Sequence, residues 1–331
     1  MKVLVTGGGG FLGGSIVKRL ARRGETVVSY SRSKYQWHNE FGVESATGDL
    51  LDVNSLINAM QGCDAVIHVA AKAGFWGPPA EYFQANLEGT KAVLDACRKA
   101  GLQKLVYPST PSVVHGGGDL NGVDESMPYP ARHESAYSAS KAAAEKLVLN
   151  SNGPDLATVA LRPHLIWGPG DPHLLPRLVA KAKAGRLRKI GNGTNLVDTV
   201  FVENAALAHI LAVDKLFPGS AIAGKAYFIA QGEPRPLWET IERLIVASGG
   251  PKLPEKSIPK PVAIAIGALC EFAWKTLPLK GEPPMTRFVA SQLATSHWFQ
   301  LDRAKADLGY LPEWSFEQGL KSLDLEYKGA D

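Results

Sequence analysis

A tyrosine and a lysine four residues apart are the pair in this sequence best suited to proton transfer. The segment YSASK holds Tyr137 and Lys141 in a stretch of helical composition, so both side chains project from one face, a single turn apart. A lysine ammonium favours phenolate over phenol, and we therefore expect Lys141 to lower the pKa of Tyr137 from its ordinary value of about 10. A tyrosine tuned in this way exchanges protons with a substrate oxygen near neutral pH.

Hydroxyl groups gather a short distance upstream, in YPSTPS. Ser109, Thr110 and Ser112 lie at the end of a strand that we expect over residues 104–109. Open parallel sheets present functional groups at the carboxyl ends of their strands, where a hydroxyl can bond a substrate oxygen. We assign that task to Thr110. The alternative is that these hydroxyls only satisfy donors of the local turn.

Four consecutive glycines stand near the start of the chain, in LVTGGGGFLGG. Glycine loses the most backbone freedom on folding, so such a run is costly unless a neighbour must approach the main chain closely. Gly7, Gly10 and Gly13 follow an expected strand and open an expected helix, which is the context of a dinucleotide-binding loop. They would allow the tight turn, the approach of a pyrophosphate to the helix N-terminus, and the packing of helix on strand. The alternative is a flexible hairpin loop.

The end of the second expected strand reads SYSRS. Dinucleotide folds that prefer NAD place an acidic residue there to hold the ribose 2′-hydroxyl, whereas this chain has Ser31 and Arg32. An arginine fork pairs with a 2′-phosphate and no carboxylate repels it, so we expect NADP (NADPH), with NAD less favoured. The alternative is that Arg32 is a solvated loop charge.

Short apolar runs alternate along the chain with longer segments of helical period. This alternation predicts the strands and helices that position these residues. This pattern is typical of parallel strands buried on both faces, and we expect a doubly wound α/β fold with a parallel Rossmann sheet. We expect strands over residues 2–6, 26–31, 43–47, 64–70, 104–109 and 158–162, and helices over residues 12–23, 86–100 and 138–150. From about Trp167 the pattern loosens. We therefore divide the chain into a nucleotide-binding domain, 1–165, and a smaller C-terminal substrate lobe, 166–331, partly interleaved with the first.

Composition excludes several classes of function. The chain has 331 residues, enough to bury a full core, and its 36 basic and 32 acidic residues form no block of like charge, so we expect no nucleic-acid partner. Cys63, Cys97 and Cys270 lie far apart without C-x-x-C spacing, which argues against disulfides and structural zinc, and we expect no metal. The first expected strand begins within two residues and no secretory signal precedes it, so we expect a cytoplasmic protein.

One apolar segment stands out in the C-terminal half, KPVAIAIGALCEFAWKTLPL, residues 260–279, interrupted by Glu271 and Lys275. It is marginal as a membrane span. Three interpretations remain open: an amphipathic lid over an apolar substrate, a peripheral contact with a membrane surface, or a helix packed on the protein's own core.

Aromatic residues that follow the fourth expected strand are candidates to line the substrate cavity. Phe75 and Trp76, with Pro78, lie in AGFWGPP and are either cavity walls or local packing. His115 and His164 lie near the catalytic strand ends. Each is either a substrate contact or, as we favour, a structural hydrogen-bonding histidine.

Six motifs resemble those of the extended short-chain dehydrogenase/reductases, in the expected order: TGGGGFLG, GDLLD, HVAA, NLEGT, YSASK and LRPHLIWGPGD. The resemblance covers nearly the whole chain and implies these cofactor contacts: Gly7, Gly10, Phe11, Leu12 and Gly13 for the pyrophosphate, Asp49 and Leu50 for the adenine, Ala70 for the adenosine ribose, and Pro163 for the nicotinamide side. It further implies that Tyr137 is the acid/base, that Lys141 also holds the nicotinamide ribose and that Thr110 orients the reacting oxygen. Members of the family commonly form homodimers through helices of the nucleotide domain.

Within that family, YPSTPSVVHGG and the tail from EPPMTRF to FEQGL resemble the branch that holds 3β-hydroxysteroid dehydrogenases, sterol-4-carboxylate 3-dehydrogenases and bacterial 2-alkyl-3-oxoalkanoate reductases of olefin biosynthesis. The resemblance implies NADPH-dependent reduction of a 3-oxo group on a long apolar substrate, most specifically a 2-alkyl-3-oxoalkanoate. The main alternative is oxidation of a 3β-hydroxysteroid or a sterol 4-carboxylate. Less favoured are a non-catalytic NADP sensor and a sugar-nucleotide epimerase, whose usual VYG turn is replaced here by VVHGG.

Overall fold

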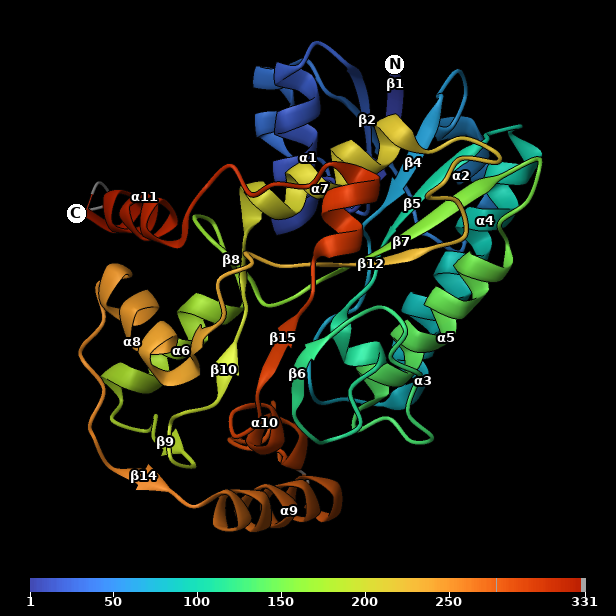
Figure 1. The fold of residues 1–331 in the computed structure, drawn as a ribbon. Coiled ribbons are helices and arrows are strands. Elements are labelled where there is room, and N and C mark those ends of the chain that lie inside the picture. Colours follow the sequence, from blue (N-terminus) through green and yellow to red (C-terminus); the bar gives the residue numbers. More distant parts are fainter. Residues whose placement is uncertain (278, 329–331) are drawn as a thin grey trace.

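A seven-stranded, wholly parallel sheet forms the centre of the computed structural model, which describes residues 1–277 and 279–328 (Figure 1). Its strand order is β12-β7-β5-β4-β1-β2-β3. The strands are β1 (Lys2–Thr6), β2 (Thr26–Ser31), β3 (Glu44–Thr47), β4 (Ala65–His68), β5 (Lys104–Pro108), β7 (Ala157–Pro163) and β12 (Ala226–Ile229). The doubly wound α/β fold expected from the sequence is confirmed.

Helices cover both faces of this sheet because alternate strand residues point to opposite sides. Val3 and Val5 of β1 face one apolar cluster, together with α1 and α7, while Leu4 faces the other, together with α2, α4 and α5. These helices are α1 (Phe11–Arg22), α7 (Val202–Lys215), α2 (Val53–Ala59), α4 (Gly89–Lys99) and α5 (Ala136–Asn150). Burial on both faces explains why the strands read as continuous apolar runs.

The strand order reverses between β1 and β4, and this reversal opens a crevice beyond the carboxyl ends of the two strands. The chain leaves β1 to one side, toward β2 and β3, and then crosses back to β4, β5 and β7. Ligands of doubly wound sheets bind at such a switch point. The fold therefore places the ends of β1, β4 and β5 around one site.

Two expected helix boundaries differ from the observed ones for identifiable reasons. The helix expected over residues 138–150 begins at Ala136, because Ser135 accepts a hydrogen bond from the Ser138 backbone N–H (3.1 Å) and completes a capping box. Residues 84–88, at the start of the helix expected over 86–100, form a π-helical segment, and the regular helix α4 begins at Gly89. The first shift places Tyr137 in the first turn of α5.

Smaller elements, most of them from beyond residue 165, lie beside the central sheet (Figure 1). A four-stranded sheet has the order β13 (Arg235–Pro236), β10 (Leu196–Val197), β15 (His297–Phe299) and β6 (Leu120–Val123). The remaining elements are the strand pairs β8 (Ile166–Trp167) with β11 (Val200–Phe201) and β9 (Lys189–Ile190) with β14 (Ser257–Ile258), and the helices α3 (Pro79–Phe83), α6 (Leu174–Lys183), α8 (Leu237–Ala247), α9 (Lys260–Thr276), α10 (Arg287–Gln292) and α11 (Phe316–Lys328).

Two elements from beyond residue 165 belong to the layers of the central sheet. Strand β12 pairs with β7, and helix α7 packs beside α1. We retain the division into 1–165 and 166–331 as a proposal, with α7 and β12 as the interleaved elements. Across the described residues, the longest apolar helices fall short of what a bilayer crossing requires.

Candidate active site

The glycine loop after β1 has the shape of a phosphate cradle. Gly7 adopts a left-handed conformation (φ +67°), and Gly10, the residue that precedes α1, donates its N–H to the Gly7 carbonyl at 2.9 Å. A Cβ on Gly13 would overlap that same carbonyl oxygen and lie 2.8 Å from its carbon. The first N–H groups of a helix lack intrahelical acceptors, and no acidic residue occupies the first turn of α1. The loop therefore fits a pyrophosphate, as the sequence predicts.

The other expected cofactor contacts lie at the same edge of the sheet. Ala70 lies directly against Gly7, and its N–H donates to the Thr6 hydroxyl (3.2 Å). Pro163 is the last residue of β7 and is buried. Phe11 and Leu12 form the first turn of α1. The structure thus gathers these residues from separate motifs around the crevice.

The GDLLD motif forms a bend beside β2. The Tyr30 hydroxyl donates to the Asp49 carbonyl (2.8 Å), and the Asp49 carboxylate accepts the Leu51 N–H (2.8 Å). Leu50 packs near Gly89 at the start of α4. The bend is therefore anchored through its main chain next to the position expected for the adenine.

The residues expected to select the cofactor lie at the end of β2. Ser31 donates its hydroxyl to the Ser33 carbonyl at 2.8 Å and so stabilises the turn. Arg32 is exposed, and no ion pair within the described residues involves it. Its guanidinium is available to a ligand at the ribose end of the crevice.

The proton-transfer pair lies on the first turns of α5. The Lys141 ammonium donates to the Pro108 carbonyl at 2.7 Å and lies 4.1 Å from the centre of the Tyr107 ring. Both partners belong to β5, so Lys141 is fixed against the carboxyl end of that strand. Tyr137, one helical turn earlier, is partly exposed and lines a cavity.

The expected lowering of the Tyr137 pKa is wrong for this structure. Burial raises the pKa of Tyr137 to about 12, and burial lowers the pKa of Lys141 to about 7. Desolvation disfavours the charged form of each group and is the largest cause of both shifts, and the Lys141 charge is not among the causes of the Tyr137 shift. Tyr137 is therefore a neutral phenol at neutral pH.

Thr110 takes part in the local turn and also acts on Tyr137. Its hydroxyl oxygen accepts the Ser112 N–H (3.2 Å) and caps the short helix Pro111–Val113. A hydrogen bond with Thr110 also acts to lower the Tyr137 pKa, although less strongly than burial raises it. The Ser109 hydroxyl is buried without a hydrogen-bond partner in the described part of the chain. Of the three hydroxyls, that of Thr110 is the one that influences the Tyr137 pKa, and its assignment to the substrate oxygen stays a prediction.

A buried polar network behind the crevice was not assigned a role from the sequence. The Asn86 side chain donates to the Ser140 hydroxyl (2.9 Å) and accepts the Lys72 N–H (2.7 Å), which ties α5 to the loop after β4. His68 joins Thr6 to Thr90 through its two ring nitrogens, at 2.7 and 3.1 Å. The NLEGT motif contained the signal, since it holds both Asn86 and Thr90.

A cavity of about 960 Å³ opens beside Tyr137. The aromatic loop after β4 forms one wall, and Phe75, Trp76 and Pro78 line it as expected. Helix α9 forms the opposite side with Ile264 and buries only Ala263 and Gly267. Helix α9 therefore borders the cavity, as the lid interpretation requires, and it also packs on the protein's own core, since Ala263 and Ile264 join an apolar cluster with Leu237 and Trp238; Pro278 lies outside the described residues.

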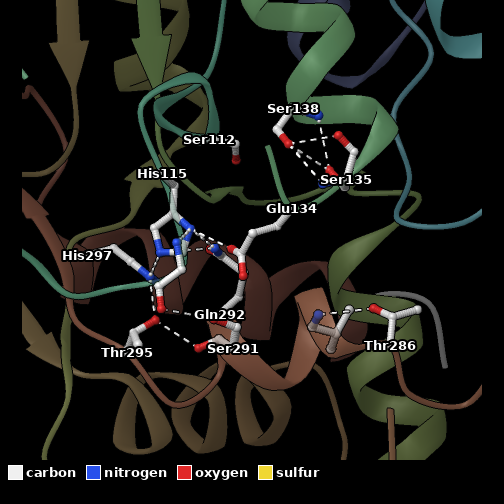
Figure 2. Close-up of polar contacts among 12 residues, drawn as sticks. Ser112, His115, Glu134, Ser135, Ser138, Thr286, Ser291, Gln292, Thr295 and His297 are labelled. Atoms are coloured by element: carbon white, nitrogen blue, oxygen red, sulfur yellow. Dashed lines mark hydrogen bonds and ion pairs between the residues drawn. The ribbon is translucent and has the colours of Figure 1, made fainter. Parts of the chain in front are cut away.

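The two histidines noted in the sequence are buried in a polar cluster behind the cavity wall. Figure 2 shows Glu134 reaching from the segment before α5 toward His115, 2.8 Å away. His115 in turn contacts His297 (3.0 Å between ring nitrogens), and His164 bonds the Asp198 carbonyl (2.5 Å). The structural role favoured for His115 and His164 agrees with these contacts. Glu134 lines the cavity itself, although no sequence motif marked it.

A glycine-lined crevice of dinucleotide-binding shape, with a Tyr–Lys pair at its edge and a cavity with an aromatic wall beyond, defines an oxidoreductase of the short-chain dehydrogenase/reductase type. Residues 4–260 match the 3-beta hydroxysteroid dehydrogenase/isomerase family, and the chain belongs to that family. The predicted family and enzyme class are confirmed.

Curated relatives share the full length of the chain. It is 50% identical over 326 residues to the 2-alkyl-3-oxoalkanoate reductase of Stenotrophomonas maltophilia, covering 98% of each chain. It is 44% identical to the protein of the same name from Shewanella oneidensis, over 96% of this chain and 84% of that one. It is 34% identical to the decarboxylating sterol-4-alpha-carboxylate 3-dehydrogenase of Mus musculus, and the match covers 97% of this chain and 89% of that protein.

Solved structures share the fold. The UDP-glucose 4-epimerase of Thermus thermophilus in complex with NAD superposes with a TM-score of 0.71 at 25% identity over all of both chains. The UDP-glucuronic acid 4-epimerase of Bacillus cereus, in complex with UDP-glucuronic acid and NAD, superposes with a TM-score of 0.76 at 22% identity, again over the whole of both chains. Both likenesses show the same doubly wound fold as this chain.

Proposed function

We propose that this protein reduces the 3-oxo group of a 2-alkyl-3-oxoalkanoate to the 3-hydroxy group. The observation that carries the proposal is the 50% identity, over 98% of both chains, to a reductase of that name. Phe75, Trp76 and Ile264 are apolar side chains that line the cavity beside Tyr137, and they suit an alkyl-bearing substrate.

The chain's own residues account for the proton side of this reaction. When bound, a reduced nicotinamide supplies the hydride. Tyr137, neutral at physiological pH, donates its hydroxyl proton to the substrate oxygen, which becomes a far stronger base than a phenolate as it gains charge. Thr110 positions that oxygen, and Lys141, whose ammonium donates to the Pro108 carbonyl, would hold the nicotinamide ribose.

The test compares two substrate classes by following NADPH and NADH absorbance separately. We expect oxidation of NADPH with a long 2-alkyl-3-oxo acid and little with a 3-ketosteroid. Rapid NAD-dependent oxidation of a 3β-hydroxysteroid, with no turnover of the oxo acid, would instead make the protein a steroid dehydrogenase. Cofactor binding without turnover of either substrate would favour the non-catalytic alternative.

We further propose NADP as the preferred cofactor, through Arg32. The Arg32→Ala variant is expected to bind NADPH about 10-fold or more weakly, because a hydrogen bond to a charged group contributes about 1.5–3 kcal/mol. NADH, which lacks the 2′-phosphate, is expected to bind almost unchanged. Isothermal titration of both cofactors checks this, and an equal loss for both would refute the 2′-phosphate role.

The outer face of α9 supports a peripheral membrane contact. Leu269 and Phe272 are 70% and 67% exposed, and Val262 and Ile266 continue the same apolar stripe. Exposed basic residues flank it along the chain: Lys256 shortly before the helix, Lys275 in its last turn and Lys280 beyond its end. We propose that this stripe rests on the anionic surface of the cytoplasmic leaflet, with the cavity opening behind it.

Replacing both Leu269 and Phe272 by aspartate is expected to lower binding to phosphatidylglycerol vesicles at least about 10-fold, since burying each side chain contributes about 1.5–3 kcal/mol. Leu325→Asp, an equally exposed leucine on α11 (72%), is the matched control and should bind like the parent protein. Co-sedimentation measures the binding. A parent protein that does not sediment, or a dimer that the double variant dissociates, would mean that the stripe has another role.

A further inference from the structure

The Lys141 ammonium is buried against the face of an aromatic ring. Lys141 and Tyr107 are 3% and 1% exposed, and the ammonium nitrogen lies 4.1 Å from the centre of the Tyr107 ring. The same ammonium donates to the carbonyl of Pro108, the next residue of β5, at 2.7 Å. The end of β5 therefore meets the ammonium with two groups, a ring face and a carbonyl oxygen.

The packing of α5 on β5 fixes this contact. Tyr107 shares an apolar cluster with Ala144 and Val148, which lie three and seven residues after Lys141 and so on the same face of α5. The Tyr107 hydroxyl is buried without a hydrogen-bond partner in the described part of the chain. The ring face is therefore the part of Tyr107 that contacts the lysine.

The carboxylate nearest to Lys141 along its own helix is already engaged. Glu145, one turn later on α5, accepts hydrogen bonds from the Arg162 guanidinium of β7 (2.7 Å) and from the Tyr129 hydroxyl (2.6 Å). Burial lowers the pKa of Lys141 to about 7, and the charge of Glu145 opposes this shift only in part. Glu145 therefore does not by itself compensate the buried ammonium.

The other titratable side chains around Lys141 are neutral near pH 7. Burial lowers the pKa of His68, on β4, to about 3. Burial also raises the pKa of Tyr137 to about 12, and it raises that of Tyr107 well above its ordinary value. The direct contacts that stabilise the ammonium are thus the Pro108 carbonyl and the Tyr107 ring.

We propose that Tyr107 is a positioning residue whose ring face holds Lys141 in its charged form at the carboxyl end of β5. The inference rests on the proposed function, in which Lys141 bonds the nicotinamide ribose. A cation over a ring is attracted by the ring quadrupole, and more strongly where water is excluded. Because the ring attracts the charge without accepting a conventional hydrogen bond, N–H donors of the ammonium remain for the ribose hydroxyls.

The first test measures the protonation of Lys141 in the cofactor-free protein. NMR of isotope-labelled lysine follows the titration, and the Lys141 signal is assigned by its loss in Lys141→Met. Tyr107→Phe keeps the ring face and should leave the pKa of Lys141 nearly unchanged. Di- and trifluorinated phenylalanine at the same position keep the shape of the ring but withdraw electron density from its face. We expect the pKa of Lys141 to fall along this series, by about one in total.

The second test measures NADPH affinity by titration calorimetry as the pH is raised. A lysine is charged below its pKa, so its contribution to binding is lost as the pH rises through that pKa. The fluorinated series should therefore lose affinity at a lower pH than Tyr107→Phe does. The matched control is the same series at Tyr227, a fully buried tyrosine of β12, two strands away from β5. Fluorination there should change neither titration.

A Lys141 pKa that stays constant along the series would overturn the role of Tyr107, and so would an equal fall in the Tyr227 series. Failure of the proposed function has a different signature. In that case the Lys141 pKa falls along the series while NADPH affinity does not follow it, so the ribose contact is wrong and the effect of the ring on the ammonium is supported. The NMR titration needs neither cofactor nor substrate, so it decides the inference even for a protein that turns over neither substrate class.

Discussion

Tyr137→Phe is expected to lower turnover by about 10²-fold or more while cofactor affinity stays nearly unchanged. The substitution removes only the hydroxyl, and general acid catalysis contributes about 10²- to 10⁴-fold. The ring still lines the cavity, so substrate binding and folding should be preserved. Steady-state kinetics with NADPH, together with calorimetric binding of the cofactor, check both halves of the prediction.

Tyr82→Phe is the natural comparison for this variant. Tyr82 also lines the cavity, and its hydroxyl donates to the Trp76 carbonyl at 3.0 Å. Losing that bond should loosen the aromatic loop. We expect turnover to fall by less than about 10-fold, because one neutral hydrogen bond contributes about 0.5–1.5 kcal/mol. Equal losses of turnover in the two variants would show that Tyr137 is not the general acid. A Tyr137→Phe protein that keeps most of its turnover would show the same.

Gly13→Ala is the second substitution with a large expected effect. The added Cβ would overlap the Gly7 carbonyl and lie 3.1 Å from the Gly8 Cα, and neither backbone group can move without opening the loop. Overpacking of this kind costs about 1–3 kcal/mol. Since the loop is the proposed pyrophosphate cradle, we expect both a loss of stability and a loss of cofactor affinity. Chemical denaturation without NADPH measures the stability of the protein. The additional stability in the presence of NADPH reports the cofactor affinity.

The adjacent glycine supplies a matched control. A Cβ on Gly14 would meet its nearest neighbour, the Trp37 ring, at an ordinary 3.5 Å, and alanine is the better helix former by about 1 kcal/mol. Gly14→Ala should therefore keep its stability and its cofactor binding. A Gly13→Ala protein that binds NADPH as tightly as Gly14→Ala would disprove the cradle.

Local sequence signals were sufficient where one segment contains the whole cause. Strand β1 has the bounds that were predicted, because a strand buried on both faces is a continuous apolar run with polar residues at its ends. The glycine loop was predicted because its residues lie together in the chain and leave no room for side chains. Strand β12 escaped prediction: it is short and lies in a Pro- and Gly-rich region, and pairing with β7 is what makes it a strand.

The sequence by itself determined the doubly wound fold, the dinucleotide loop and the spacing that puts Tyr137 and Lys141 on one helix face, since each depends on residues close together along the chain. Only the tertiary structure decided the protonation of that pair, because burial by distant elements sets the desolvation that raises one pKa and lowers the other. It also decided which face of α9 lines the cavity. Solvent exclusion and long-range contacts are properties of the packed molecule, and no short segment encodes them.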